Sequence, residues 1–332
     1  MLFRSPMRLK LILFAAAALA CFSVRAGAEN YPDRPIRLVV PTGTGGAADI
    51  ISRMLAEKLQ TSLGQTVIVE DRPGANGIVG ANYVLSAPAD GYTLMMGHIG
   101  LMTINSHIYK DIKLNPLTEF APVTLATTYP NLLVVNNKLP VHSVAELVQY
   151  AKKNPDALHY SSSGFGASFH MAFELLKAQA GINAVHVPYT GTAVALTAVI
   201  AGNVDTAFTD TITSAPQIAG NTLRGIAIST RSRSPMLPDM PTVAESGVPG
   251  LADFDVVGWN GIVVKTGTPP DRIKMLNEHI RRALTSPDVV ERVSKLGAEV
   301  AVGTPEEFAQ FMRNEDEKWG NLAKTAKLVV LE

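Results

Sequence analysis

Two short segments of the 332-residue chain combine hydroxyl side chains with glycine, each between an apolar run and a helix-like pattern. They are Pro41 to Asp49, PTGTGGAAD, and Ser161 to Ser168, SSSGFGAS. Glycine lets the backbone approach a ligand closely, and the unpaired amides at the start of a helix favour negative charge. Ligands of open α/β sheets bind beyond the carboxyl ends of strands, where such segments lie. The pattern therefore predicts two anion-binding loops, one in each half of the chain.

The first loop carries no nucleotide-binding motif. GTGGAA is not G-x-G-x-x-G, and G-x-x-x-x-G-K-[ST] does not occur in the chain. The alternative interpretation is a tight turn without a ligand, in which Asp49 or Thr44 caps the following helix. A second loop of the same design in the other half of the chain favours a ligand site.

An exported serine hydrolase acting at Ser162 or Ser163 is an alternative from another class of protein. The segment SSSGFG lacks the G-x-S-x-G signature of many such enzymes. The residues that still leave a catalytic triad possible are His98, His170, Asp205 and Asp210. The histidines are too scattered for a metal site. We therefore expect no catalytic residues, no metal and no other cofactor.

The first 28 residues are predicted to be a secretory signal peptide. A basic segment is followed by the apolar run Leu11 to Phe22 and by an A-x-A cleavage site at Ala26 to Ala28, which indicates export to the periplasm. The alternative is lipoprotein processing at Cys21, the one cysteine of the chain. Cleavage after Ala28 changes the basic and acidic residues from 29 and 29 to 25 and 29, a formal charge of −4. This acidic balance disfavours a nucleic-acid partner.

Apolar runs of strand length alternate with helical patterns along the rest of the chain. This alternation is typical of parallel sheets covered by helices on both faces. We predict an α/β protein of two doubly wound lobes with a central cleft, in which 29–128 and 254–332 form the first lobe and 129–253 the second. The chain would cross between them near Thr127 to Pro130 and near Asp253 to Val257, and two crossings make a hinge.

Three helices are expected near the C-terminus, over 271–284, 287–296 and 305–326. The segments GTPPDRI and GTPEEF both place proline in a first helical turn, where it is favoured. This part of the chain has too few strand patterns for a third domain. We therefore expect these helices to pack against the first lobe.

The sequence after the signal peptide resembles the extracytoplasmic receptors of tripartite tricarboxylate transporters, called Bug receptors. The resemblance covers nearly all of it and depends on many motifs in a fixed order. These motifs are YPDRPIRLVVP, GQTVIVEDRPGANG, ADGYTLMMG, FAPVTL, VHVPYTGTAVAL, LPDMPTVAESGVPG and GTPPDRI.

The resemblance implies a type II periplasmic binding protein that closes on a small organic carboxylate, which could be a mono-, di- or tricarboxylate or an aromatic acid. It implies delivery of this ligand to membrane permease subunits. In the family, both loops hold the carboxylate through backbone amides, hydroxyls and bridging waters. The candidate ligand-binding residues are Thr42, Gly43, Thr44, Gly45, Gly46, Ala47, His98, Ser162, Ser163, Gly164, Phe165, Gly166, Ala167, Ser168, Tyr189, Thr190 and Asp210.

Three positions depart from the family pattern. The first loop usually reads close to P-F-P-P-G-G, a small residue often stands where His98 is found, and lysine is common at Thr190. These departures leave the identity of the carboxylate open. We expect a monomer, and a ligand sensor for a two-component kinase is the alternative within binding proteins.

Overall fold

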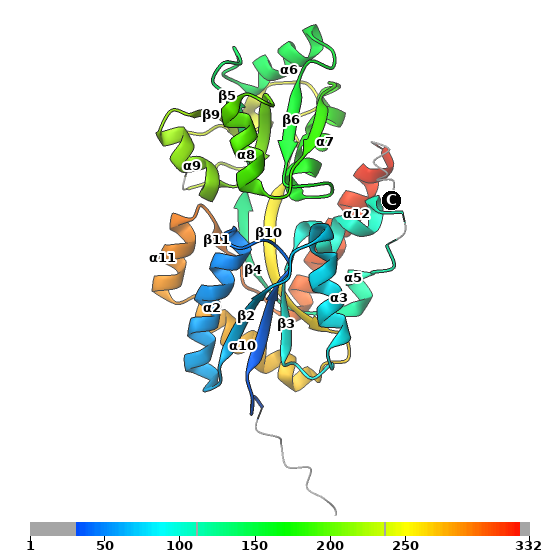
Figure 1. Ribbon diagram of the computed structural model, residues 1–332, viewed down its shortest axis with the longest axis vertical. Helices are drawn as coiled ribbons and strands as arrows, with labels where there is room; N and C mark the ends of the chain where they lie inside the picture. The colour runs from blue at the N-terminus through cyan, green and yellow to red at the C-terminus, as the bar shows by residue number, and fades with distance from the viewer. Residues whose placement is uncertain (1–30, 111, 236, 326–332) are drawn as a thin grey trace, which may run out of the picture. The chain divides into compact units, whose positions relative to one another are not determined.

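The computed structural model describes residues 31–110, 112–235 and 237–325. The strands and helices of these residues belong to one compact unit that begins at Arg34. They form an α/β fold of two lobes, each built on one sheet with helices packed against it (Figure 1). The predicted signal peptide over residues 1–28, the alternative processing site at Cys21 and the predicted final helical residue, Ala326, lie outside the described residues.

The first sheet is mixed. In spatial order its strands are β11 (Glu299–Val300), β4 (Phe120–Pro130), β10 (Val257–Lys265), β3 (Thr93–His98), β1 (Ile36–Val40) and β2 (Val67–Asp71). β1 pairs in parallel with β2 and β3, whereas β10 is antiparallel to both β3 and β4. The apolar run of β1 lies between β3 and the edge strand β2, and the side chains of Ile36, Leu38 and Val39 are fully buried there.

The second sheet is also mixed. In spatial order its strands are β7 (Val185–Pro188), β6 (His159–Ser162), β8 (Thr206–Thr209), β5 (Leu132–Asn136) and β9 (Leu223–Ile228). β6 pairs in parallel with β7 and β8, and β5 is antiparallel to β8 and β9. The parallel strands therefore end at one edge of the sheet, where the second predicted loop begins.

The prediction of parallel sheets was wrong for the strands that connect the lobes. β10 returns to the first sheet between β3 and β4, and β5 enters the second sheet directly after β4 (Figure 1). Parallel neighbours need a crossover helix, whereas antiparallel neighbours do not. Short apolar runs do not reveal strand direction, because a buried strand in either orientation has the same composition.

The helices cover both sheets, and their ends follow the expected signals. They are α2 (Ala47–Leu63), α3 (Ile78–Ser86), α4 (Asn105–Ile108), α5 (Pro116–Glu119), α6 (Val144–Lys153), α7 (Ser168–Ala180), α8 (Thr192–Ala201), α9 (Thr211–Ala219), α10 (Pro270–Leu284), α11 (Pro287–Lys295) and α12 (Pro305–Thr325). Proline begins each of α10, α11 and α12, as the sequence predicts. Glycine in the left-handed conformation ends α2 at Gly64 and α7 at Gly181, with φ of 68° and 62°.

Ser229 joins the chain segments that run between the two sheets. Its N–H donates to the carbonyl oxygen of Asn131 over 2.8 Å, and its hydroxyl accepts from the N–H of Asn131 over 2.9 Å. The same hydroxyl donates to the carbonyl oxygen of Val256. Asn131 follows β4 and Val256 precedes β10, so one buried serine ties both connections together. The domain boundaries stay a prediction.

β10 has glycines where neighbouring aromatic rings approach its backbone. A Cβ at Gly261 would overlap the ring of Phe308, and one at Gly258 would overlap the ring of Tyr129. Phe308 is in turn packed edge-on against Trp259, with ring centroids 5.7 Å apart. The rings of α12 and β4 can therefore lie on β10 because these two positions lack side chains.

We expect Gly261→Ala to destabilise the protein by about 1–3 kcal/mol, because the added methyl forces the buried Phe308 ring to move. Urea unfolding would measure the change. Gly43→Ala is the control, since the space around Gly43 is open, and its stability should stay within about 0.5 kcal/mol of wild type. Equal stability of Gly261→Ala and wild type would contradict this account of the packing.

Candidate functional site

The loop after β1 and the end of β3 lie at one edge of the first sheet. β1 and β3 are parallel neighbours, with Val39 opposite Met95, so their carboxyl ends point the same way. This places Thr42–Ala47, which follows β1, on the same edge as His98, the last residue of β3. The structure therefore brings together the predicted site residues of this lobe.

Part of the first loop is held by the chain itself. The N–H of Gly45 donates to Asp49 Oδ2 over 2.8 Å, and Thr44 Oγ1 donates to Asp71 Oδ2 over 3.2 Å. Arg53 pairs with Asp49 Oδ1 over 2.7 Å and with Asp71 Oδ2 over 2.9 Å. The exposed hydroxyl of Thr44 thus has a protein partner, which makes it a weaker candidate for ligand contact than the sequence suggested.

The suggestion that Asp49 or Thr44 is the N-cap of the following helix was wrong. Gly46 is the N-cap of α2, and no side chain caps this helix. The first intrahelical bond runs from Ile50 N–H to the carbonyl oxygen of Gly46 over 3.1 Å. The amides before Ile50 therefore have no acceptor within the helix. Thr42 Oγ1 is buried nearby along the chain without a hydrogen-bond partner. These amides, except that of Gly45, which donates to Asp49, and this hydroxyl are the donors that the first loop can offer to a ligand.

The loops after β6, β7 and β8 share one edge of the second sheet. Ser162, at the end of β6, is opposite Pro188 of β7, and the N–H of Tyr189 donates to the carbonyl oxygen of Ser162 over 3.0 Å. α7 begins after the loop, with Ala167 as its N-cap and no side-chain cap. The start of α7 can therefore donate amide hydrogen bonds at this edge, as the start of α2 can at the other.

Asp210 has a structural role at the same edge. It is the N-cap of α9, where its Oδ1 accepts from the N–H of Thr213 over 2.8 Å and from its Oγ1 over 2.9 Å. A carboxylate of the chain itself thus occupies this helix start. Burial raises the pKa of Tyr129, and the negative charge of Asp210 raises it further.

The remaining predicted ligand-binding residues at this edge lie in the loop after β6 and directly after β7. Ser163 and Gly164 are half-buried, while Gly166, Ala167 and Ser168 are buried. Phe165 is 41% exposed and forms the exposed tip of the loop. Among the residues after β7, the ring of Tyr189 packs against an apolar cluster around Leu196 and Val199, and Thr190 is exposed.

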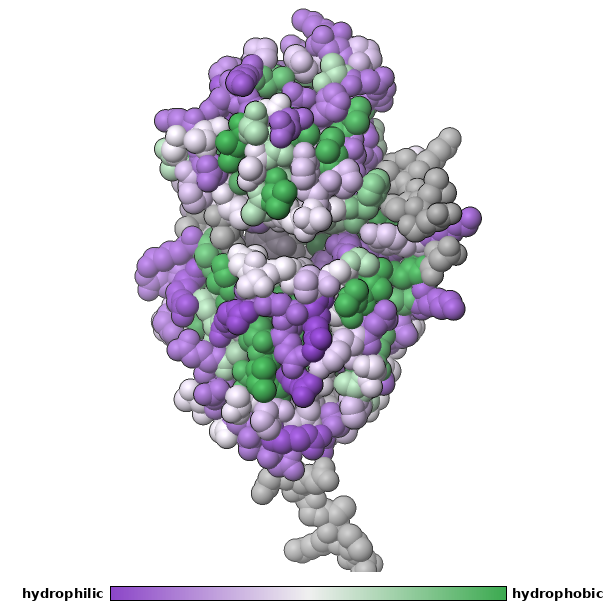
Figure 2. Space-filling view, in the orientation of Figure 1, coloured by the Kyte–Doolittle hydropathy of each residue, from purple (hydrophilic) through white to green (hydrophobic). Residues whose placement is uncertain are grey.

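The two edges meet through direct contacts. Tyr109 Oη, at the end of α4, donates to the carbonyl oxygen of Phe165 over 3.3 Å. A Cβ added to Gly166 would lie 3.1 Å from Oδ1 of Asn105, so the loop backbone touches the first lobe closely. On another element, Thr211 Oγ1 donates to the carbonyl oxygen of Leu296 over 3.0 Å. Figure 2 shows a hollow between the two lobes on one face, bordered largely by residues of intermediate hydropathy.

Sequence reasoning missed these contact residues. Tyr109, Asn105 and Thr211 lie in segments without a motif, and they become important only because two distant loops are folded against each other. The signal that could have drawn attention to one of them is the position of Thr211 directly after the polar end of β8.

His98 contributes a neutral donor. Its Nδ1 accepts from the N–H of Leu101 over 3.4 Å, so its proton is assigned to Nε2. Nε2 is buried and has no hydrogen-bond partner. Burial lowers the pKa of His98 to about 4, so the ring is uncharged at neutral pH. His98 can therefore donate one hydrogen bond but cannot supply a positive charge.

The described residues do not assemble a catalytic triad at Ser162. Its hydroxyl lies 2.7 Å from His186 Nε2, but it is fully buried and also bonded to Gly164. His186 Nδ1 has no partner, so no carboxylate orients this ring as a triad requires. Asp205 instead accepts from the N–H of His159 over 2.7 Å. Within residues 31–110, 112–235 and 237–325, no group of three or more metal-ligating side chains was found.

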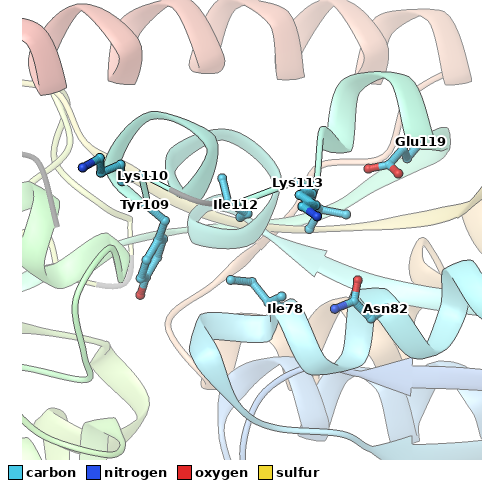
Figure 3. Close-up of a pocket in the computed structure, with 8 residues that line it drawn as sticks. Ile78, Asn82, Tyr109, Lys110, Ile112, Lys113 and Glu119 are labelled. Atoms are coloured by element: carbon cyan, nitrogen blue, oxygen red, sulfur yellow. The ribbon is translucent and has the colours of Figure 1, made fainter. Parts of the chain in front are cut away.

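Two surface pockets are lined by residues outside the predicted loops, although Tyr109 of the first pocket contacts Phe165. One has a volume of about 420 Å³ and is lined by side chains of α3 and of the segment from α4 to α5, including Tyr109, Lys110 and Lys113 (Figure 3). The other has a volume of about 690 Å³ and lies between α10 and α12. Neither contains a predicted site residue, so the facing loops remain the candidate site. No helix in the described part of the chain is both long and apolar enough to cross a membrane.

Two lobes on mixed sheets, with polar loops facing each other at the carboxyl ends of strands, define the class of periplasmic solute-binding proteins. The chain belongs to the family described as tripartite tricarboxylate transporter family receptor, whose model matches residues 51–328. The resemblance stated from the motifs is thereby confirmed.

Individual relatives agree with this assignment. A protein of Pseudomonas sp. strain P51, named UPF0065 protein in the tcbD-tcbE intergenic region, is 37% identical over 317 residues, covering 95% of this chain and 93% of that protein. The structure of R. palustris Rpa4515 with adipate has a TM-score of 0.85 and 34% identity, covering 91% of this chain and 100% of that chain. The structure of the periplasmic binding protein BugD has a TM-score of 0.82 and 33% identity, covering 90% of this chain and 99% of that chain.

Three histidines, of which His170 is buried and His98 and His186 are partly buried, predict how stability depends on pH. Burial lowers the pKa of His98 to about 4 and the pKa values of His170 and His186 to about 3. The positive charge of Lys177 lowers the pKa of His170 further. The neighbouring His170 lowers the pKa of His186 further. Histidines of the unfolded chain titrate near about 6.5. The unfolded state therefore binds protons first, and the stabilisation present above about pH 6.5 is lost as the pH falls toward 4.

We expect the free energy of unfolding to fall less between pH 7.5 and pH 5 for His186→Phe than for wild type, by about 1–2 kcal/mol. Phenylalanine keeps a ring at this position but cannot bind a proton. Urea unfolding at both pH values would measure the difference, and carboxylates contribute equally to both proteins. The same pH-dependent loss in both proteins would contradict the assignment of a partly buried, neutral His186.

Proposed function

We propose that this receptor binds a small organic carboxylate between its two lobes and delivers it to the membrane subunits of a tripartite tricarboxylate transporter. The observation that carries the proposal is that two helix starts without side-chain caps, those of α2 and α7, follow polar loops at facing sheet edges. Each offers amide donors and a favourable dipole to one anion. Adipate, a dicarboxylate, is bound by the related Rpa4515.

The free energy of binding that such a receptor requires is modest. Micromolar affinity corresponds to about −8 kcal/mol, and hydrogen bonds to a charged group contribute about 1.5–3 kcal/mol each. A few bonds from loop amides, Thr42 Oγ1, His98 Nε2 and Ser163 would supply this after the costs of ordering and closure. The predicted contacts of Gly43, Gly46 and Ala47 are backbone contacts in this proposal. The amides of Gly45, Gly164 and Gly166 donate within the chain, to Asp49, Ser162 and His170, so these glycines shape the loops and do not donate to the ligand.

The finer aspects of the function follow from the family and the sequence. The protein acts in the periplasm after removal of residues 1–28, as a monomer, and performs no catalysis. The first lobe comprises 29–128 and 254–332, and the second comprises 129–253. The buried position and the bonding of Ser162 support a receptor over a hydrolase.

We expect a screen of organic acids by thermal shift to raise the melting temperature for a restricted set of carboxylates, with adipate included as a probe. A ligand that binds the native state at 100 times its Kd stabilises by about 2.7 kcal/mol. The matching amides of these acids are the control, because they keep the carbon skeleton but lack the charge. No shift with any carboxylate, or equal shifts with acids and amides, would contradict the proposal.

Loop hydroxyls can be tested separately from loop structure. Thr42→Val combined with Ser163→Ala should weaken binding of the best acid in the screen at least tenfold, because two donors to the carboxylate are lost. Thr44→Val is the matched control: its hydroxyl donates to Asp71, so this change should affect stability more than affinity. Unchanged affinity of the double variant by calorimetry would remove these hydroxyls from the site.

A hydrolase or a sensor would behave differently. A serine-directed probe should leave Ser162 and Ser163 unmodified, and labelling of either would support the hydrolase. A pull-down from membranes with and without the best acid should recover permease subunits. Recovery of a sensor kinase in their place would favour a sensory role.

A further inference from the structure

Two histidines, the buried His170 and the partly buried His186, form hydrogen bonds to the second loop. His170, in the first turn of α7, accepts a hydrogen bond at Nδ1 from the N–H of Gly166 over 3.2 Å. His186, on the neighbouring strand β7, bonds to Ser162 Oγ through Nε2 over 2.7 Å. His186 thus fixes Ser162 at the beginning of the loop, and His170 fixes Gly166 near its end.

A stack of rings fixes the orientation of both imidazoles. The ring centroids of His170 and His186 are 4.1 Å apart, and the stack continues from His186 to Tyr160 at 4.8 Å and from Tyr160 to Phe173 at 3.9 Å. Phe165, at the loop tip, lies edge-on to both histidines, at 5.0 and 4.9 Å. The imidazoles therefore cannot rotate away from the loop without breaking this packing.

We propose that His170 and His186 are positioning residues for ligand binding, which hold Ser162–Ser168 in the shape that presents its amides and hydroxyls to the carboxylate. The inference rests on the proposed function of this loop. Neither histidine needs to touch the ligand, since both act through the atoms of the loop that they bond.

The position of Gly166 also matters where the lobes meet. Gly166 has a left-handed φ of 70°, and a Cβ there would overlap Ile108 Cδ1 of the first lobe. The carbonyl oxygen of the preceding Phe165 accepts from Tyr109 Oη. The bond from Gly166 to His170 therefore sets both the shape of the loop and the fit between the lobes.

The bond to Gly166 requires a neutral His170. An imidazole accepts at Nδ1 only if its proton is on Nε2, so the bond defines the tautomer. The titratable groups beside the pair are Tyr160, Glu174 and Lys177. Glu174 Oε1 accepts from Tyr160 Oη over 2.5 Å and from Lys177 Nζ over 2.7 Å. Protonation of Nδ1 would remove the acceptor and release Gly166.

The experiment compares His170→Leu, which removes the acceptor, with His170→Asn, whose Oδ1 can take the place of Nδ1. In the wild-type protein without ligand, the Gly166 amide should exchange with solvent at least tenfold more slowly than the amide of the exposed Gly43. The Leu variant should lose this protection, and the Asn variant should regain it. The ¹⁵N signals of His170 should show a proton on Nε2 and none on Nδ1 down to about pH 5.

Affinity for adipate supplies a second measurement. His170→Leu should bind adipate at least tenfold more weakly than wild type, with His170→Asn within threefold, while the melting temperatures of the two variants agree. If His170→Leu does not fold, His186→Gln and His186→Phe form the corresponding pair, since glutamine can still bond Ser162 Oγ.

Rapid exchange of the Gly166 amide in the wild type, or wild-type affinity in a folded His170→Leu variant, would overturn the inference. If the wild type binds neither adipate nor any other organic acid, the proposed function fails. The exchange and tautomer measurements still decide whether the histidines position the loop, so the two failures can be distinguished.

Discussion

The amides at the starts of α2 and α7 form the interaction on which the rest of this structure depends. They follow two polar loops, one in each lobe, and no side chain caps either helix. An unpaired N–H in a partly enclosed site needs water or a ligand to complete it. α9, which starts at the edge of the second sheet, has Asp210 as its cap and has no such requirement. The fold thus leaves the starts of α2 and α7 without side-chain caps, one at the carboxyl ends of the parallel strands in each sheet.

The candidate site works with dipoles and hydroxyls and not with formal positive charge. The two polar loops, Pro41 to Asp49 and Ser161 to Ser168, contain no lysine or arginine, and burial keeps His98, His170 and His186 neutral at neutral pH. Arg53 is engaged with Asp49 and Asp71. Hydrogen bonds from backbone amides, direct or through water, can be individually modest and still hold an anion in sum. Such a site suits a receptor, because its ligand must also leave.

The sequence predicted the class of the fold and the family, because alternation of strands and helices and many ordered motifs are local properties. The starts of α10, α11 and α12 were predicted from proline for the same reason. The direction of the strands was not predicted, because the apolar pattern of β10 and β5 would be the same in either orientation. The bonding of Thr44 to Asp71, and of Gly166 to His170, depends on segments brought together only by folding. The sequence therefore placed His170 only among possible triad residues and did not single out His186.

The place of β10 in the first sheet has a consequence for the order in which the chain can fold. This strand lies between β3 and β4, yet it follows the whole second sheet along the chain. A chain that emerges from its N-terminus therefore cannot join β3 to β4 until residue 265 is available, and β11 completes the first sheet only at residue 300. The strands of the second sheet, from 132 to 228, are contiguous and can pair earlier. The lobe that begins the sequence is the last to be finished, and β3 and β4 each lack a neighbouring strand until β10 has been made.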